Sequence, residues 1–363
     1  MRTLLLLATL AAAPALDADT LLSAGELYVK NGDGKKAIPV LEKALKAGTL
    51  DAAGQGRALT ALGVARSQLG DNDAAVAHFE EAIAKNPADE KPYLMLGMTY
   101  DITDRYEEAR KAYRRGVEKF PKSGSLLREL GATELLLGDA AAAVEHLGAA
   151  MKRQAEDPEL MRDYGAALLA VGRAEDAVKV LQDARGLDSE NAQVVFTLAD
   201  ALAKAGRVQP ALEAYDDAIN LDRNHAPAHF HKGLLLAKKG DAAGAVASYR
   251  AALKADPGLL RARAALGVAL SRLEGKEDEA LQVLRAVVEK DPSFAEAHAQ
   301  IAAVLEKKGD LPGAEQAMTA AVSRREGDAR LWRELARLQE KRGRKKEAEA
   351  SLKAAQKAER GQQ

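Results

Sequence analysis

The sequence predicts an all-α protein, and three observations lead to this prediction. Ala, Leu, Glu, Lys and Arg are abundant, while only 4% of the 363 residues are aromatic and 11 are proline, a composition that favours helix over strand. Hydrophobic residues make up 47% of the chain, which is enough for a continuous core. A small residue followed five positions later by alanine recurs at a nearly constant spacing of 34 residues, which indicates stacked copies of one helical repeat.

The first residues have the pattern of a secretory signal peptide. One arginine precedes an apolar run over Thr3–Ala13, and small residues follow at Ala13 and Ala15, where a signal peptidase reads the chain. We expect residues 1–15 to be removed, with cleavage after Ala18 as the alternative. The apolar run is shorter than a bilayer requires, and no other stretch could cross a membrane. The expected location is periplasmic or secreted.

Ten turns are expected after this leader, because glycine can leave a helix through a left-handed conformation at little cost. Successive turn residues are 38 residues apart once, 35 apart once and 34 apart in the other intervals. The ten turn residues are Gly32, Gly70, Asp104, Gly138, Gly172, Gly206, Gly240, Gly275, Gly309 and Gly343. Where aspartate follows the glycine, as at Asp71, Asp139, Asp241 and Asp310, we expect it to cap the next helix.

Each turn is flanked by one small and one bulky position, which predicts two closely packed helices per repeat. Glycine inside a helix costs about 1 kcal/mol relative to alanine, so its recurrence indicates a tight contact. The small residues, seven before the turn, are Gly25, Gly63, Gly97, Gly131, Gly165, Ala199 and Gly233. The bulky residues, nine after the turn, are Leu41, Phe79, Tyr113, Leu147, Leu181, Tyr215, Tyr249, Leu284, Met318 and Leu352.

These spacings resemble those of the tetratricopeptide repeat, in which small, alanine, aromatic and proline residues recur every 34 positions. The resemblance covers nearly all of the chain after the leader and implies an array over residues 19–358, followed by a polar tail at 359–363. It further implies a right-handed superhelical solenoid of about ten helix–turn–helix repeats. In the resembling family, the first helix of each repeat lines a concave groove, and the residues ten and six before the turn point into it.

The family offsets select candidate residues for binding a partner in that groove. They are Leu94, Met98, Arg128, Arg162, Phe196, Phe230 and Leu234. Apolar side chains beside arginines suit an amphipathic helix or an extended segment that carries an acidic residue. The other interpretation is that Leu94, Met98, Phe196 and Phe230 pack against adjacent helices. No repeat has the lysine and asparagine pair with which the family's chaperone-tail clamp holds a terminal carboxylate.

Composition argues against several other classes of function. With 53 basic and 54 acidic residues, the chain lacks the basic excess typical of nucleic-acid binding. The absence of cysteine excludes disulfides, thiolate metal sites and cysteine nucleophiles. No phosphate-binding loop or hydrolase motif occurs, and no cofactor is expected. His225, His229 and His231 are close in sequence, but Pro227 is expected to set a helix start that separates them as metal ligands.

The sequence therefore predicts a non-enzymatic scaffold for protein–protein contacts in a bacterial cell envelope. A helper in polysaccharide export or in assembly of a secretion machine is one alternative, and a metal-dependent hydrolase using His225–His231 is another. Residues 321–363 hold 13 basic and 7 acidic residues. This basic end has two interpretations, a surface for an acidic partner or the polar cap that a terminal repeat requires.

Overall fold

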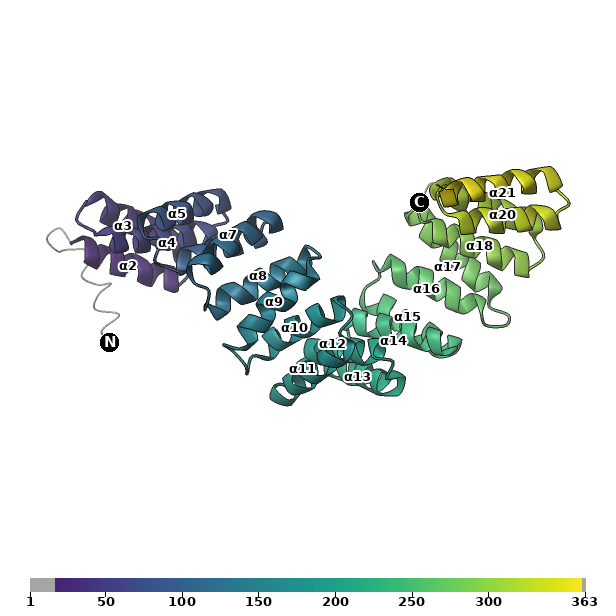
Figure 1. Cartoon of the computed structure of the whole chain (residues 1–363), viewed down its shortest axis with the longest axis horizontal. Helices are drawn as coiled ribbons and strands as arrows, with labels where there is room; N and C mark the ends of the chain where they lie inside the picture. The colour runs from purple at the N-terminus through teal and green to yellow at the C-terminus, as the bar shows by residue number, and fades with distance from the viewer. Residues whose placement is uncertain (1–16, 361–363) are drawn as a thin grey trace. The chain divides into compact units, whose positions relative to one another are not determined.

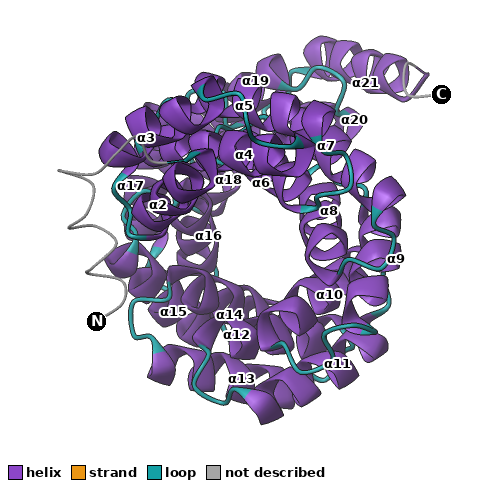
Figure 2. Cartoon of the chain, turned by 90° about the vertical axis from the view of Figure 1, so that its left-hand side faces the viewer, coloured by secondary structure: helices purple, strands orange, loops and turns teal. Residues whose placement is uncertain are grey.

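The computed structural model describes residues 17–360 and confirms the all-α prediction. These residues form twenty α-helices and no strand. Figure 1 and Figure 2 show the helices joined by loops along the described part of the chain. Residues 1–16, which hold the predicted signal peptide, and residues 361–363 lie outside the described part. None of the described helices is long and apolar enough to cross a membrane.

The helices pair across the predicted turns. The helices before the turns, called first helices here, are α2 (Ala18–Lys30), α4 (Ala52–Gln68), α6 (Lys91–Asp101), α8 (Gly124–Leu136), α10 (Pro158–Ala170), α12 (Ala192–Lys204), α14 (Ala226–Lys239), α16 (Leu260–Ser271), α18 (Ala295–Lys307) and α20 (Ala329–Lys341). The second helices are α3 (Gly34–Lys46), α5 (Asn72–Lys85), α7 (Tyr106–Lys119), α9 (Ala140–Met151), α11 (Ala174–Leu187), α13 (Val208–Leu221), α15 (Ala242–Ala255), α17 (Glu277–Lys290), α19 (Leu311–Arg324) and α21 (Lys345–Arg360).

The chain divides into two compact units between Ser189 and Glu190. Unit 1 contains α2 to α11, and unit 2 contains α12 to α21. In both, the substantial contacts among described helices join helices that are next to each other, or next but one, along the chain. The contacts between helices next but one connect successive first helices, from α2 to α10 in unit 1 and from α12 to α18 in unit 2. These first helices form a continuous wall within each unit.

The turns have the predicted backbone conformation, because all ten turn residues have positive φ. Asp104 is the only described residue other than glycine with positive φ, at 57°. After the turn, Asp139, Asp241 and Asp310 each accept a hydrogen bond from a backbone N–H of the following helix. Asp71 does not, since its side chain accepts a hydrogen bond from Arg66 instead. The expectation of a cap at Asp71 is therefore wrong.

Close packing between the two helices of a repeat explains the recurring small residue. A Cβ atom on Gly97 would lie 2.3 Å from the ring of Tyr113, and one on Gly63 would lie 2.5 Å from the ring of Phe79. Leu352 departs from the pattern of bulky residues, because its side chain is 39% exposed. No further described helix pair follows α21 to cover it.

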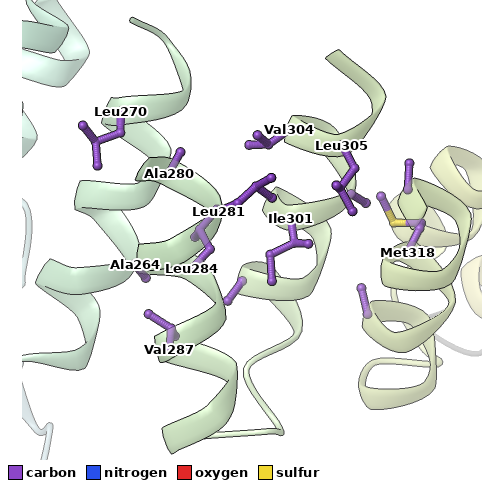
Figure 3. Packing of buried hydrophobic residues seen from close by; sticks show 14 of the residues in the cluster. Ala264, Leu270, Ala280, Leu281, Leu284, Val287, Ile301, Val304, Leu305 and Met318 are labelled. Atoms are coloured by element: carbon purple, nitrogen blue, oxygen red, sulfur yellow. The ribbon is translucent and has the colours of Figure 1, made fainter. Parts of the chain in front are cut away.

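Buried apolar side chains continue from repeat to repeat within a unit. In unit 2, one cluster joins Leu270 and Leu284 to Ile301 and Met318, so residues of four successive helices, α16 to α19, share a core (Figure 3). Many members are alanines, which allow the helices to approach closely. Each helix pair therefore buries its apolar face against its neighbours in the chain.

Candidate partner-binding surface

The wall of unit 1 carries exposed apolar side chains on α6 and α8. Residues four apart on a helix lie on one face, so Leu94, Met98 and Ile102 follow one another along α6 and its C-terminal cap. Leu94 is half-buried and packs against the core, whereas Met98 is 42% exposed and Ile102 is 65% exposed. On the neighbouring helix, Leu136 is 68% exposed. We call Leu94, Met98, Ile102 and Leu136 the apolar strip.

Two residues of this strip, Ile102 and Leu136, were not among the sequence candidates. Both lie two positions before a turn, which is one helical turn beyond the offsets that the resemblance supplies. The four-residue periodicity that places Leu94 and Met98 on one face of α6 also places Ile102 on that face, and the same offset in the next repeat gives Leu136. They are the most exposed large apolar side chains in the described part of the chain.

The arginines predicted for the groove are already paired within the protein. Arg128 contacts the carboxylates of Asp157 and Glu159 at 2.9 Å and 3.0 Å. Arg162 contacts Asp163 at 2.7 Å. Each guanidinium is therefore oriented by a neighbouring acid, and binding a ligand carboxylate would compete with these pairs. Arg128 joins α8 to the start of α10 and so stabilises the packing between two repeats.

The candidates in unit 2 lie in different surroundings. Phe196 is only 9% exposed, and its ring centroid lies 4.8 Å from that of His225 and 5.2 Å from that of His231. Phe230 is half-buried against the core, while Leu234 is 44% exposed. Phe196 thus has the environment of a packing residue and offers little surface to a ligand.

The histidines of the 225–231 segment have separate partners. His225 precedes α14, where its Nδ1 accepts a hydrogen bond from the Ala228 N–H, and burial lowers its pKa. His229 contacts the Arg223 carbonyl at 3.1 Å, and His231 Nδ1 lies 2.7 Å from Asp200 Oδ1. Among the described residues, no group of three or more His, Cys, Asp or Glu side chains could hold a metal ion. The segment caps and packs α14.

Ion pairs neutralise much of the basic end. Glu306 accepts hydrogen bonds from Arg337 and Lys341, and these lower its pKa to about 2. Glu315 is paired with Arg342 and Arg344. These contacts favour a polar cap over a free basic surface.

Comparison with known proteins gives one consistent result. Models described as tetratricopeptide repeat match residues 16–88, 90–224, 196–259, 236–305 and 271–333. A tetratricopeptide repeat protein from Parabacteroides merdae is 19% identical, with a TM-score of 0.51 over 65% of this chain and 93% of that one. The C-terminal part of a TPR repeat-containing protein from Cytophaga hutchinsonii is 17% identical, with a TM-score of 0.51 over 68% of this chain and 99% of that one. No curated protein matches this sequence.

Proposed function

The chain is built from tetratricopeptide repeats, and from this premise we propose that it is a non-enzymatic scaffold that binds a protein or peptide on the wall of unit 1. The apolar strip carries the proposal. Large apolar side chains exposed together on neighbouring helices are typical of an interaction site, and an amphipathic helix or extended segment suits a surface of this kind.

The strip is large enough to contribute substantially to binding. Fully burying one such side chain contributes about 1.5–3 kcal/mol, and Met98, Ile102 and Leu136 are each 42–68% exposed. Covering these three side chains therefore contributes about 2–4 kcal/mol before the costs of association, since roughly half of each remains to be buried. Removing that contribution would weaken binding roughly 30- to 1,000-fold.

The test is capture of partners from the native envelope by the immobilised mature chain with chemical crosslinking. Met98→Asp with Ile102→Asp should abolish capture of the partners that the wild type retains, while the helical circular dichroism spectrum stays unchanged. Leu187→Asp with Leu352→Asp is the matched control, because these residues are 50% and 39% exposed on second helices. Capture that survives the first pair of substitutions and is lost with the second would place the site outside the wall.

We also propose that the scaffold works in the periplasm or outside the cell after removal of residues 1–15. Cleavage after Ala15 would keep Asp17, whose carboxylate accepts a hydrogen bond of 2.8 Å from Thr20 N at the start of α2. Cleavage after Ala18 would remove this cap, which typically contributes about 1 kcal/mol, together with Ala18 itself, which is 1% exposed. Intact-mass measurement of protein from a periplasmic extract should give a chain starting at Leu16. A full-length chain in the cytoplasm would contradict export.

A further inference from the structure

A cavity of about 380 Å³ lies among the first helices of unit 1, which also carry the apolar strip. It opens between α2, α4 and the start of α6, and its lining residues are Glu26, Val29, Lys30, Arg57, Thr60, Ala61, Val64, Asp89 and Lys91. Val64 lines the cavity and packs against the same buried cluster as Leu94 of the strip. The cavity and the strip therefore lie over the same buried cluster, and we call the surface that includes both of them the path.

The charges around this path are unevenly distributed. Arg57 is held by Glu26 through two hydrogen bonds of 3.0 Å and 2.6 Å, so these two charges neutralise each other. Asp89 accepts a hydrogen bond of 3.0 Å from the backbone N–H of Lys91. The ammonium groups of Lys30 and Lys91 form no ion pair with any described residue. The cavity lining thus holds three basic groups against the carboxylates of Glu26 and Asp89, a net charge of +1, and Lys30 and Lys91 are the basic groups without an ion pair among the described residues.

The other end of the path lacks such an excess. Ile102 and Leu136 contribute only apolar surface, and the nearby Arg128 is already contacted by two carboxylates. A ligand that matches both ends needs an acidic group at one end and apolar side chains at the other. A basic segment would place like charges against Lys30 and Lys91, which is unfavourable.

We infer that the partner segment is acidic at one end and apolar at the other, with its carboxylates beside Lys30 and Lys91 and its apolar side chains on the strip. The inference rests on the proposed function and adds to it the chemistry and the direction of the bound segment. The acidic end lies over the last residue of α2 and the first residue of α6, and the apolar end lies over the C-terminal ends of α6 and α8. Long-range attraction by the lysines would speed association at low salt.

The test begins with an unbiased library of 16-residue displayed peptides selected on the mature full chain. Selected peptides are synthesised with a fluorescent label, and their affinities are measured by fluorescence anisotropy. We expect enrichment of Asp and Glu together with Leu, Ile, Met or Phe. A photo-crosslinker placed beside the acidic residues should label the end of α2 or the start of α6, and one placed beside the apolar residues should label the C-terminal ends of α6 or α8.

Charge reversal gives the decisive comparison. Lys30→Glu with Lys91→Glu should lower the affinity for these peptides about 2- to 30-fold, since each exposed ion pair contributes modestly to binding. The double substitution should also remove much of the dependence of that affinity on salt concentration. Lys46→Glu with Lys85→Glu makes the same charge change on α3 and α5, where both lysines are exposed, and should change affinity less than about twofold.

The outcomes separate this inference from the proposed function. Two results would overturn the inference and leave the proposed function standing, provided that the selected peptides require Met98 and Ile102 for binding. The first is enrichment of Lys and Arg in these peptides, and the second is an affinity that does not change when Lys30 and Lys91 are replaced. Crosslinks in the reverse order overturn the stated direction. If no selected peptide depends on Met98 and Ile102, or if the strip instead joins two copies of this chain, both proposals fail.

Discussion

Gly172 and Gly186 make it possible to separate backbone conformation from packing, because a Cβ atom added to either glycine would meet no atom within 4 Å. Gly172 lies in the turn between α10 and α11 with φ of 80°. Its neighbour Arg173 donates its backbone N–H to the Leu168 carbonyl at 2.8 Å, which closes the end of α10. Gly186 lies inside α11 in ordinary helical conformation. Alanine should therefore have opposite effects at the two positions.

The magnitudes follow from the two conformations. A left-handed conformation costs an L-residue about 1–2 kcal/mol, and the stiffer unfolded chain of an alanine variant offsets about 0.4–1 kcal/mol of this. Gly172→Ala should thus destabilise unit 1 by roughly 0–1.6 kcal/mol, with a central value of about 0.8 kcal/mol. Gly186→Ala should stabilise it by up to about 0.5 kcal/mol, because alanine is the better helix former but Gly186 is the second-to-last residue of α11, where the effect is smaller than in a helix interior.

Urea unfolding followed by circular dichroism, together with hydrogen exchange of the amides in α10 and α11, measures both changes. Exchange is needed because opening of a repeat array is local and a single unfolding free energy is not assured. Gly172→Ala should speed exchange around the turn, and Gly186→Ala should slow it. Effects of the same sign in both variants would refute the argument that the left-handed conformation selects glycine at this turn.

Three further predictions concern the core and two ion pairs. Tyr215→Ala removes a ring that is 2% exposed and should destabilise unit 2 by about 3–5 kcal/mol, with faster hydrogen exchange around residues 192–250; protection lost equally along the whole chain would contradict it. A hydrogen bond to buried Glu134 raises the pKa of His146 above its ordinary 6.5. The contribution of this pair to the free energy of unfolding is therefore present below pH 6.5 and is lost as pH rises through the raised pKa. In His146→Gln, the fall of the urea midpoint with rising pH that this pair causes should vanish. The hydrogen bond from Arg337 lowers the pKa of Glu306 from 4.5 to about 2, so the contribution of this pair to the free energy of unfolding is present above pH 4.5 and is lost as pH falls towards 2. Glu306→Gln should lower the urea midpoint at pH 7 and reduce the fall of that midpoint between pH 4.5 and 2. An unchanged fall of the midpoint in acid would contradict this prediction.

Features governed by local chemistry were accessible from the sequence. Glycine at a turn and glycine opposite a bulky side chain each follow from the cost of a Cβ atom at one position, so the positive φ of Gly172 and the contact of Gly97 with Tyr113 could be predicted. The exposure of Ile102 also follows from helical periodicity. The offsets taken from the resembling family end at Met98, which is one helical turn before Ile102.

Features that depend on side chains from another repeat were not accessible. Phe196 and Leu94 have the same offset from their turns, yet the rings of His225 and His231 lie beside Phe196. Arg128 is contacted by Asp157, which lies 29 residues later in the chain. Which of several nearby acids an arginine contacts depends on rotamers and on the angle between helix pairs, and neither has a clear signature in one sequence.

The restriction of contacts to neighbouring helices has a mechanical consequence. No described helix is joined by substantial contacts to one far away in the chain. A force applied to the two ends of the chain therefore meets no long-range contact that must break before the repeats unfold. The load passes through the helix pairs in series, and the weakest junction between pairs opens first. Each 34-residue repeat that unravels releases up to about 120 Å of extended chain. Under tension the molecule therefore lengthens in steps, as an extensible tether does, while the repeats that remain folded keep their own surfaces.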